Sequence, residues 1–316
     1  MMRFHRFPIG PAGSGRLRII AWFAAGVGLA VAGLAAFWAG PVTAGDHPRL
    51  AKKAGRPAAR LAPCSGRYPL VASLGLRPGL EGPALRDALE RGVPGIGRLW
   101  GVEENAGTVA APGGGVELRV LYPKGSISPS SKDRPLGGAG FVAPLAPGGL
   151  ERACLRYRVR FEDGFEFRKG GKLPGLFGGE APSGGDPVAG DSGFSTRLMW
   201  RRDGEGEVYA YVANKRGKYG ASIGRGHWSF VPGETATIEQ EVVLNDPGSA
   251  NGIVRVWVDG EPVVEQTDLV YRTVPGGKVD GLMFSTFFGG SSKSWKSPKD
   301  QHAWFADFRL YGSANR

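Results

Sequence analysis

Short alternating runs of apolar and polar residues dominate the chain from Gly95 to its C-terminus. Clear examples are the runs 116–122, 153–161, 236–244 and 253–258, and Gly, Pro or Asp-Gly turns separate them. A period of about 2 is the pattern of β-strands that bury one face. About a dozen such runs, with no helical pattern between them, predict an all-β fold of antiparallel sheets, as a sandwich or a barrel.

Two earlier segments are helix candidates, the first by its length and lack of charge and the second by the helical spacing of its apolar residues. The first is an uncharged run at 19–40, about 22 residues long, which is enough to span a bilayer. The second is residues 82–91, the one good helix candidate after that run. We therefore expect an N-terminal hydrophobic helix, a short second helix, and then the all-β domain.

The flanks of the apolar run indicate export. Four arginines, at positions 3, 6, 16 and 18, precede it, and no acidic residue comes before Asp46. Val42-Thr43-Ala44 resembles a small-residue cleavage site. Residues 1–45 are thus either a cleaved signal peptide or an uncleaved membrane anchor. In both cases the rest of the chain is expected to be periplasmic or extracellular, anchored to the inner membrane if the segment is uncleaved.

The next part of the chain, residues 46–94, is expected to be a basic linker followed by a short helical lead-in. Residues 46–60 are basic and rich in Ala and Pro, with no apolar periodicity, and are predicted to be a solvated linker. Residues 61–94 form the lead-in, which contains the helix candidate. Residues 95–316 are then one β domain.

The positive charge of the chain is concentrated in its N-terminal part. The formal net charge is +11 and the pI about 9.8, which by itself favours nucleic acid, an anionic membrane or an acidic polymer as partner. Residues 1–60 hold nine Lys and Arg against one acid, whereas residues 61–316 hold 31 against 28. The basicity therefore belongs mainly to the apolar run and the linker, and we expect no nucleic-acid partner.

Two cysteines, Cys64 and Cys154, are the only ones in the chain. In an oxidising compartment such a pair is more often bridged than free. We expect a disulfide that pins the lead-in to the β domain; two separate buried thiols are the alternative.

Common catalytic motifs are missing from the sequence. There is no His-Glu-x-x-His, no Walker loop and no Gly-x-Ser-x-Gly elbow, and the four histidines are scattered, so no metal or cofactor is expected. Glu239 and Glu241 share one face of a predicted strand, where a pair of acids for glycoside hydrolysis could lie. A solvated strand face is the preferred interpretation of these two residues.

A glycine-rich segment at 169–179 leaves Lys172 as its notable side chain. Such a lysine suits an anion that approaches the backbone closely, although an exposed loop lysine would have the same pattern.

The polar face of a predicted hairpin follows. In 194–200, alternation places Ser195, Arg197 and Met199 on one face of a strand. The next strand follows a predicted three-residue turn at 202–204, with Gly204 in the left-handed conformation. This turn brings Arg197 opposite Tyr209 and Ser195 opposite Tyr211. A surface ladder of polar residues is the alternative.

These segments resemble polysaccharide lyase family 14, the alginate and glucuronan lyases. The resemblance rests on Gly-Gly-Lys-Leu-Pro-Gly-Leu-x-Gly-Gly at 170–179, Phe-Ser-x-Arg-x-Met-Trp-Arg at 194–201 and Tyr-x-Tyr at 209–211. Further matches lie at 224–226, 256–260 and 284–290, and the resemblance spans about 95 to 312. It implies a β-jelly roll and no cofactor. The catalytic residues that it implies are Lys172, Ser195, Arg197, Tyr209 and Tyr211.

The function that this resemblance implies is β-elimination on an acidic, uronate-containing polysaccharide. Lys172 and Arg197 would neutralise the carboxylate, Ser195 would orient substrate, and Tyr209 or Tyr211 would act as base and acid, with a pKa below about 10 because of the nearby cations. His227 and His302 are rival bases. Substrate contacts are expected from Lys169, Met199, Arg225 and Phe288, and the segment 287–299 is expected to edge the cleft.

Two other functions remain open at this point. A non-catalytic module that binds acidic glycans would have the same face, and a glycoside hydrolase would need two acids in the cleft. The expected partners are an acidic polysaccharide and, if the N-terminal segment is uncleaved, the membrane. The domain is expected to be a monomer.

Overall fold

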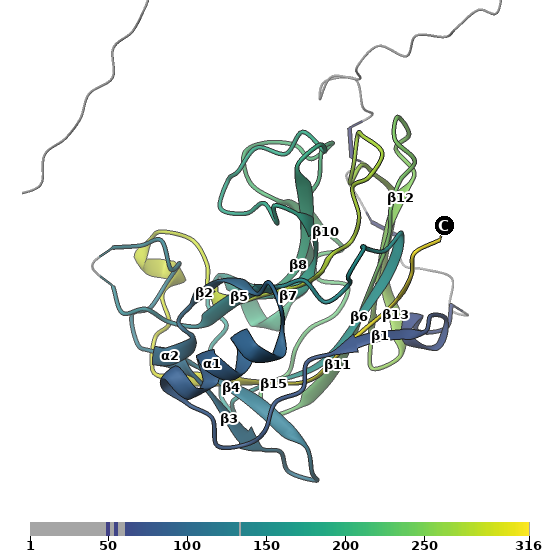
Figure 1. The fold of residues 1–316 in the computed structure, drawn as a ribbon. Coiled ribbons are helices and arrows are strands. Elements are labelled where there is room, and N and C mark those ends of the chain that lie inside the picture. The colour runs from purple at the N-terminus through teal and green to yellow at the C-terminus, as the bar shows by residue number, and fades with distance from the viewer. Residues whose placement is uncertain (1–48, 51–53, 56–60, 133, 316) are drawn as a thin grey trace, which may run out of the picture. The chain divides into compact units, whose positions relative to one another are not determined.

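The computed structural model describes residues 49–50, 54–55, 61–132 and 134–315 (Figure 1). The predicted signal peptide or anchor, residues 1–45, lies outside the described residues. Within the part that is described, no helix is both long and apolar enough to cross a bilayer.

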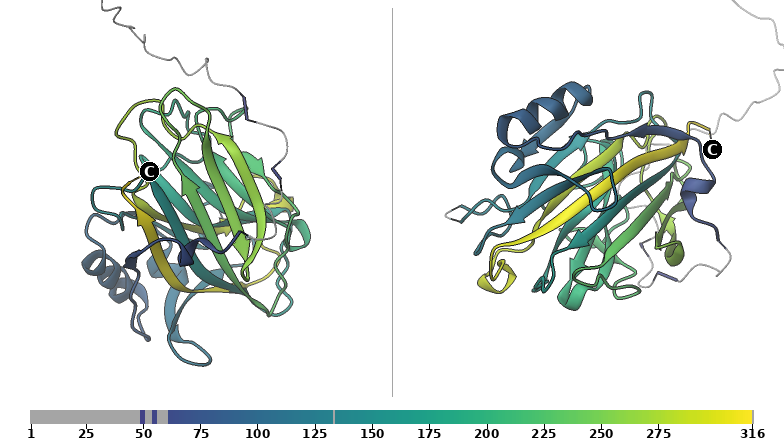
Figure 2. Two further views of the ribbon diagram at one scale, coloured as in Figure 1. Left: turned by 90° about the vertical axis from the view of Figure 1, so that its right-hand side faces the viewer. Right: turned by 90° about the horizontal axis from the view of Figure 1, so that it is seen from below.

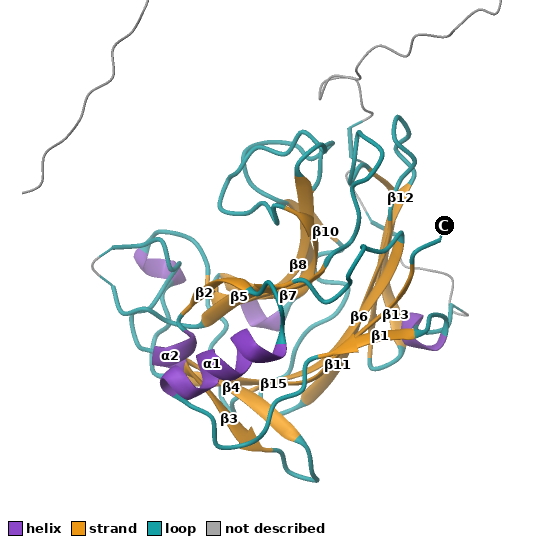
Figure 3. Ribbon diagram, in the orientation of Figure 1, coloured by secondary structure: helices purple, strands orange, loops and turns teal. Residues whose placement is uncertain are grey.

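Two antiparallel sheets form the domain, as the alternation pattern predicts, and they are consistent with a jelly-roll sandwich (Figures 1 and 3). In the back sheet the strands are ordered β13-β12-β11-β6-β15-β4-β3, and β1 also pairs with β15. In the front sheet the order is β10-β9-β8-β7-β14-β5-β2. About half of the neighbouring strand pairs are not consecutive in sequence, so each sheet is assembled from several parts of the chain.

The strand bounds follow the two sheets. Those of the back sheet are β1 Leu70–Ser73, β3 Ala106–Ala110, β4 Val116–Tyr122, β6 Arg152–Phe161, β11 Thr235–Val243, β12 Gly252–Val258, β13 Glu261–Leu269 and β15 Gln301–Ser313. Those of the front sheet are β2 Gly97–Trp100, β5 Ala139–Ala143, β7 Gly170–Gly179, β8 Gly193–Arg201, β9 Gly206–Tyr211, β10 Ala221–Ile223 and β14 Gly281–Phe288. The four strands predicted from alternation are confirmed to within a residue at each end.

Helices are few and short. They are α1 Gly82–Gly92 and α2 Val102–Asn105, with 3₁₀ turns at Cys64–Gly66, Arg202–Gly204 and Lys293–Trp295. The predicted helix is confirmed as α1: Pro83 lies in its first turn, where a missing N–H costs nothing, and Leu85 and Leu89 are buried on one face. Because these leucines join the main core, the lead-in belongs to the same folded unit as the strands, and no domain boundary falls at residue 95.

Aromatic side chains fill the space between the sheets. Trp200, Phe161, Tyr122 and Phe288 pack edge to face, with ring centroids 5.4 to 5.8 Å apart. Phe288, predicted to contact substrate, is therefore a core residue, only 1% exposed. Alternation along β14 explains the error, because the side chain on the opposite face is that of its neighbour, Phe287.

The lead-in crosses the outer face of the back sheet. Cys64 and Cys154 are joined in the predicted disulfide, and β1 runs antiparallel beside β15 (Figure 2). A solvated face at Glu239 and Glu241 was the wrong interpretation, since both are buried beneath this segment. The Ser65 amide donates to Glu239 and the Tyr68 hydroxyl to Glu241.

Part of the predicted linker also contacts the domain. The Leu50 amide donates to the Asn214 carbonyl, and Gly55 forms an antiparallel bridge with Glu265 of β13. The prediction of a solvated linker is therefore wrong for these two residues. The bridge at Gly55 forms because β13 is an edge strand, whose backbone groups are free to pair with another segment.

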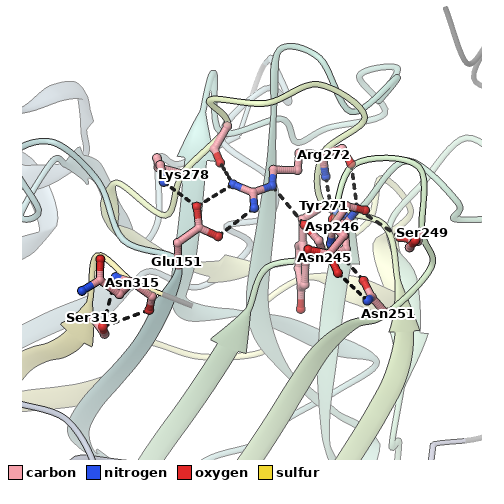
Figure 4. Close-up of polar contacts among 11 residues, drawn as sticks. Glu151, Asn245, Asp246, Ser249, Asn251, Tyr271, Arg272, Lys278, Ser313 and Asn315 are labelled. Carbon is pink, nitrogen blue, oxygen red and sulfur yellow. Dashed lines mark hydrogen bonds and ion pairs between the residues drawn. The ribbon is translucent and has the colours of Figure 1, made fainter. Parts of the chain in front are cut away.

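A buried polar network ties four connections together at one end of the sandwich (Figure 4). Arg272, after β13, binds both carboxylate oxygens of Glu151, before β6, at 2.7 and 2.9 Å. Lys278, before β14, donates to the same carboxylate. The side-chain oxygen of Asn245, after β11, accepts hydrogen bonds from the backbone amides of Tyr271 and Arg272. The network fixes where the chain enters β14, a strand that carries part of the site described next.

Candidate active site

A cavity of about 660 Å³ lies over the face of the front sheet that is turned away from the core. Its size is in the range of small-ligand sites. Strands β7, β8, β9 and β14 supply its floor, and the polar side chains that line it include Lys172, Arg197, Arg201, Tyr209, Tyr211 and Ser285. Segments before β5 and after β14 supply its walls, with Ser128, Gly290, Ser291 and Trp295. The prediction that 287–299 edges the cleft is confirmed for Phe287, Gly290, Ser291 and Trp295.

Lys172 is placed by a glycine-rich strand and not by a loop. In β7 it pairs with Met199 of β8, and its side chain is buried. A Cβ at Gly171 would lie 2.1 Å from the Trp200 ring, and one at Gly175 would lie 2.2 Å from the Thr196 carbonyl. The glycines therefore let β7 pack tightly on its neighbours, which explains the motif better than a backbone that approaches an anion.

The β8–β9 hairpin has the register that the sequence predicts. Arg197 pairs with Tyr209, and Ser195 with Tyr211. The turn runs over Arg202–Gly204, with Asp203 at φ 56° and Gly204 at φ 79°. Two consecutive left-handed residues reverse the chain so that the polar faces of both strands coincide.

Ser195 is the one residue of the predicted catalytic set that does not line the cavity. It is fully buried, and its hydroxyl donates to the Pro182 carbonyl at 2.6 Å. Its place opposite Tyr211 is as predicted, but its side chain supports the segment after β7.

The amine of Lys172 is surrounded by two arginines, a methionine sulfur and an aromatic ring. Its Nζ is 3.1 Å from the Met199 sulfur and 4.3 Å from the centroid of the Tyr209 ring. Burial, together with the charges of Arg197 and Arg201, holds the pKa of Lys172 well below its usual range, and the carboxylate of Glu207 opposes this only in part. Both effects favour the neutral form of the amine.

Two arginines share the cavity with Lys172. Arg197 is 3% exposed, it donates to the Ser285 hydroxyl at 3.2 Å, and its Nε has no partner among the described residues. Burial lowers the pKa of Arg197 to about 10, so it stays charged at neutral pH. Arg201 is paired with Glu207, which is fully buried.

Tyr211 differs from the expectation of a phenol that ionises easily. Burial raises the pKa of Tyr211 to about 12, and the neighbouring Tyr209 adds to the rise, whereas the Gly185 amide and Arg197 oppose it. That amide donates to the Tyr211 hydroxyl at 2.9 Å. Desolvation of the phenolate therefore outweighs the nearby cations.

The other predicted site residues are divided between the cavity and the outside. Met199 lines the cavity, whereas Lys169 does not, and Arg225 is exposed and paired with Glu205 at 3.3 Å. The rival bases lie elsewhere: His227 has its Nδ1 2.9 Å from the Val263 carbonyl, and His302 is in β15 of the back sheet. Neither histidine lines the cavity.

Several lining residues were not foreseen. Arg201 follows Arg197 and Met199 at the alternation period, so the pattern contained the signal for it. Ser285 was not foreseen either, although it alternates in β14 with Phe287, which belongs to the predicted cleft edge. Trp100 and Arg98 come from a distant segment and carry no local signal.

The described residues contain one group of metal-ligand types, Cys64, Cys154 and Glu239, and its two sulfurs are joined to each other in the disulfide. It lies at the back sheet, away from the cavity residues.

Comparisons with known proteins agree with the fold. The family model for polysaccharide lyase 14 matches residues 111–308. No curated protein sequence matches the chain. The solved structure of the marine PL-14 alginate lyase from Aplysia kurodai is similar, with 34% identity over 77% of this chain and 99% of that one and a TM-score of 0.66.

Two more distant structures share the fold. Alginate lyase Aly36B has 22% identity over 77% of this chain and 97% of its own, with a TM-score of 0.62. Alginate lyase vAL-1 from Chlorella virus has 22% identity over 77% and 100%, with a TM-score of 0.60.

Proposed function

The chain belongs to polysaccharide lyase family 14 and is a polysaccharide lyase, and we propose that it cleaves a polyuronate of the alginate or glucuronan type by β-elimination. The relatives described above support this substrate class: three are alginate lyases, and Aly36B mutants have been solved with alginate tri- and tetrasaccharide.

The convergence of Lys172, Arg197 and Arg201 in one cavity is the observation that carries this proposal. Cations that are held together in a buried place repel one another, and an incoming carboxylate relieves that repulsion. In a uronate, the proton on C5 becomes acidic only when the adjacent carboxylate is neutralised. Arg197 has an unpartnered buried Nε and is the group best placed to bind that carboxylate.

Lys172 is the base in this proposal, in place of the tyrosine that the sequence suggested. Its burial and its cationic neighbours favour the neutral amine, which can accept the C5 proton. The ammonium that forms then lies over the Tyr209 ring, where a cation–π contact stabilises it.

Tyr211 is the acid, because its raised pKa keeps it protonated. As the amine takes the C5 proton, a double bond forms between C4 and C5, the bond from C4 to the bridging oxygen breaks, and the phenol protonates that oxygen. The products are one new chain end and one unsaturated uronate. Solvent returns the proton from Lys172 to Tyr211.

The test uses defined polymannuronate, polyguluronate and glucuronan with the whole protein. We expect ultraviolet-absorbing unsaturated ends from at least one polymer. Lys172→Ala and Lys172→Arg should both abolish them, since arginine keeps the charge but cannot act as base at neutral pH. Retained polymer of unchanged chain length would indicate binding alone, and an active Lys172→Arg variant would return the base to a tyrosine.

We also propose that the enzyme acts outside the cytoplasm. The Cys64–Cys154 disulfide supports this, because such bonds persist in oxidising compartments. Cell fractionation with antibody against the β domain tests it: recovery of oxidised protein in the periplasm, membrane or medium is expected, and reduced protein in the cytosol would contradict it.

A further inference from the structure

We infer that Arg201 is a second carboxylate-binding residue, which holds the uronate next to the reacting one, and that the buried Glu207 fixes its orientation. This inference rests on the proposed function and deepens it, because it assigns a residue to the carboxylate of the sugar next to the reacting one.

The geometry of β8 separates the two arginines along the cavity floor. Arg197 and Arg201 are four residues apart on the same face, which corresponds to about 13 Å of strand. Lys172 pairs with Met199, halfway between them. The backbone positions of the two arginines are therefore farther apart than the width of one pyranose ring, and Lys172 lies beside the position between them. Each arginine is thus placed to meet the carboxylate of a different sugar.

Glu207 holds Arg201 from beneath. It lies opposite Met199 on β9 and is fully buried. Its Oε1 accepts a hydrogen bond from the Arg201 guanidinium at 2.5 Å, and its Oε2 accepts one from the Ser222 hydroxyl. Both carboxylate oxygens are thereby engaged within the protein, and the side chain of the arginine is held on the cavity floor.

Arg201 keeps hydrogen-bonding capacity for a ligand. Its guanidinium lies 6.0 Å from the Tyr209 ring centroid and 5.9 Å from that of Trp295, and its Nε is buried without a partner among the described residues. A guanidinium has five N–H donors, and the pair with Glu207 occupies only part of them. A group that served only as an ion pair would not need to line the cavity.

The first experiment compares Arg201→Gln with Arg202→Gln. Arg202 is exposed in the adjacent turn and does not line the cavity, so its replacement removes the same charge without touching the site. On polyuronate we expect Arg201→Gln to raise KM about 10- to 100-fold with a much smaller change in kcat, as for a lost bond to a charged group. Arg202→Gln should behave as wild type. Equal KM values in the two variants would overturn the inference.

The second experiment replaces the ligand group instead of the residue. A partly carboxyl-reduced polyuronate should bind wild type more weakly than the intact polymer does, and Arg201→Gln should lose much of this discrimination. To keep the test independent of turnover, binding is measured in a Lys172→Ala background with intact and reduced oligouronates. Discrimination that is unchanged in the Arg201→Gln variant would contradict the inference.

Two further variants separate binding from folding. Arg201→Lys keeps the positive charge but loses the planar guanidinium that can bind a carboxylate through two hydrogen bonds. It should give a KM between those of wild type and Arg201→Gln, with the wild-type melting temperature. Glu207→Gln should raise KM in the same direction as Arg201→Gln, because it frees the guanidinium from its support. If wild type yields no unsaturated ends from any uronan, the proposed function fails; if wild type is active and Arg201→Gln matches it, only the present inference fails.

Discussion

The ammonium nitrogen of Lys172 lies 4.3 Å from the centre of the Tyr209 ring, in a cavity that it shares with two arginines. No carboxylate forms an ion pair with Lys172 among the residues that the structure describes, although Glu207 is close enough to act on it through its charge. The charged form of Lys172 therefore destabilises the folded protein, whereas its neutral form is suited to accept a proton.

Lys172→Met should consequently stabilise the protein while abolishing activity. The folded-state pKa of Lys172 is lower than its unfolded value of about 10.4, so folding disfavours the charged form at neutral pH and this penalty fades as pH rises towards that value. We expect a gain of about 1 kcal/mol or more in the free energy of unfolding. Chemical denaturation at neutral pH measures it, and the gain should shrink at about pH 10; an unstable variant would argue that the ammonium is well compensated.

Tyr211→Phe and Tyr209→Phe should differ sharply. Loss of the Tyr211 hydroxyl removes the proposed acid, and kcat should fall about 10²-fold or more. Phenylalanine at 209 keeps the ring beneath the Lys172 ammonium, so its effect on kcat should be small, whereas Tyr209→Leu should reduce kcat further. Steady-state kinetics on the preferred uronan decide this, and equal losses in both phenylalanine variants would favour Tyr209 as the base.

Ser195→Ala should affect stability more than catalysis. The substitution leaves the buried Pro182 carbonyl without its donor, at a cost of about 1–3 kcal/mol. Activity per folded molecule should remain near that of wild type, because the hydroxyl does not line the cavity. A variant with the wild-type melting temperature but no activity would show that the serine touches substrate during turnover.

The disulfide should make a large contribution to stability. It closes a loop with a sequence separation of 90 residues, for which chain-entropy arguments give about 4.6 kcal/mol. A Cys64→Ser, Cys154→Ser double variant, or wild type in reductant, should unfold at correspondingly lower denaturant concentration. The cavity is built on the other sheet, so activity below the unfolding transition should be retained; a loss of activity without a loss of stability would point to a redox role.

Acid should weaken the attachment of the lead-in. Burial alone would raise the pKa of Glu241, but hydrogen bonds from Tyr68, Arg67 and Arg255 outweigh it and hold that pKa below its usual range. The resulting stabilisation is present above the unfolded value of about 4.3 and is lost as pH falls through the folded-state pKa. Denaturation between neutral pH and about pH 3 should show this loss, and Glu241→Gln should be less stable at neutral pH with a flatter acid dependence.

Local pattern was enough to predict the strands, the helix and the register of the β8–β9 hairpin. Alternation assigns a face to each residue, and the turn at Arg202–Gly204 fixes which faces meet. The same rule of alternation, applied to β14, would have placed Phe288 in the core and Phe287 in the cavity. Both that error and the omission of Arg201 come from incomplete use of a signal that the sequence contains.

Burial by distant segments could not be predicted in this way. Glu239 and Glu241 alternate like solvent-facing residues and become buried only because Ser65 and Tyr68, more than 170 residues earlier, lie over them. The raised pKa of Tyr211 has a similar origin, since it depends on how completely the surrounding loops exclude water. Such effects arise from tertiary packing, for which the sequence has no local signature.

The lead-in is held to the back sheet by the disulfide and by side-chain contacts to Glu241. The family match begins at residue 111, yet a polypeptide trimmed to Gly95 would lack Cys64 and the groups that cover the back sheet. Glu241 would then keep Arg255 but lose Arg67 and Tyr68, and Cys154 would become a free thiol. We therefore expect the smallest stable unit of this enzyme to begin upstream of Cys64, earlier than the start of the family match.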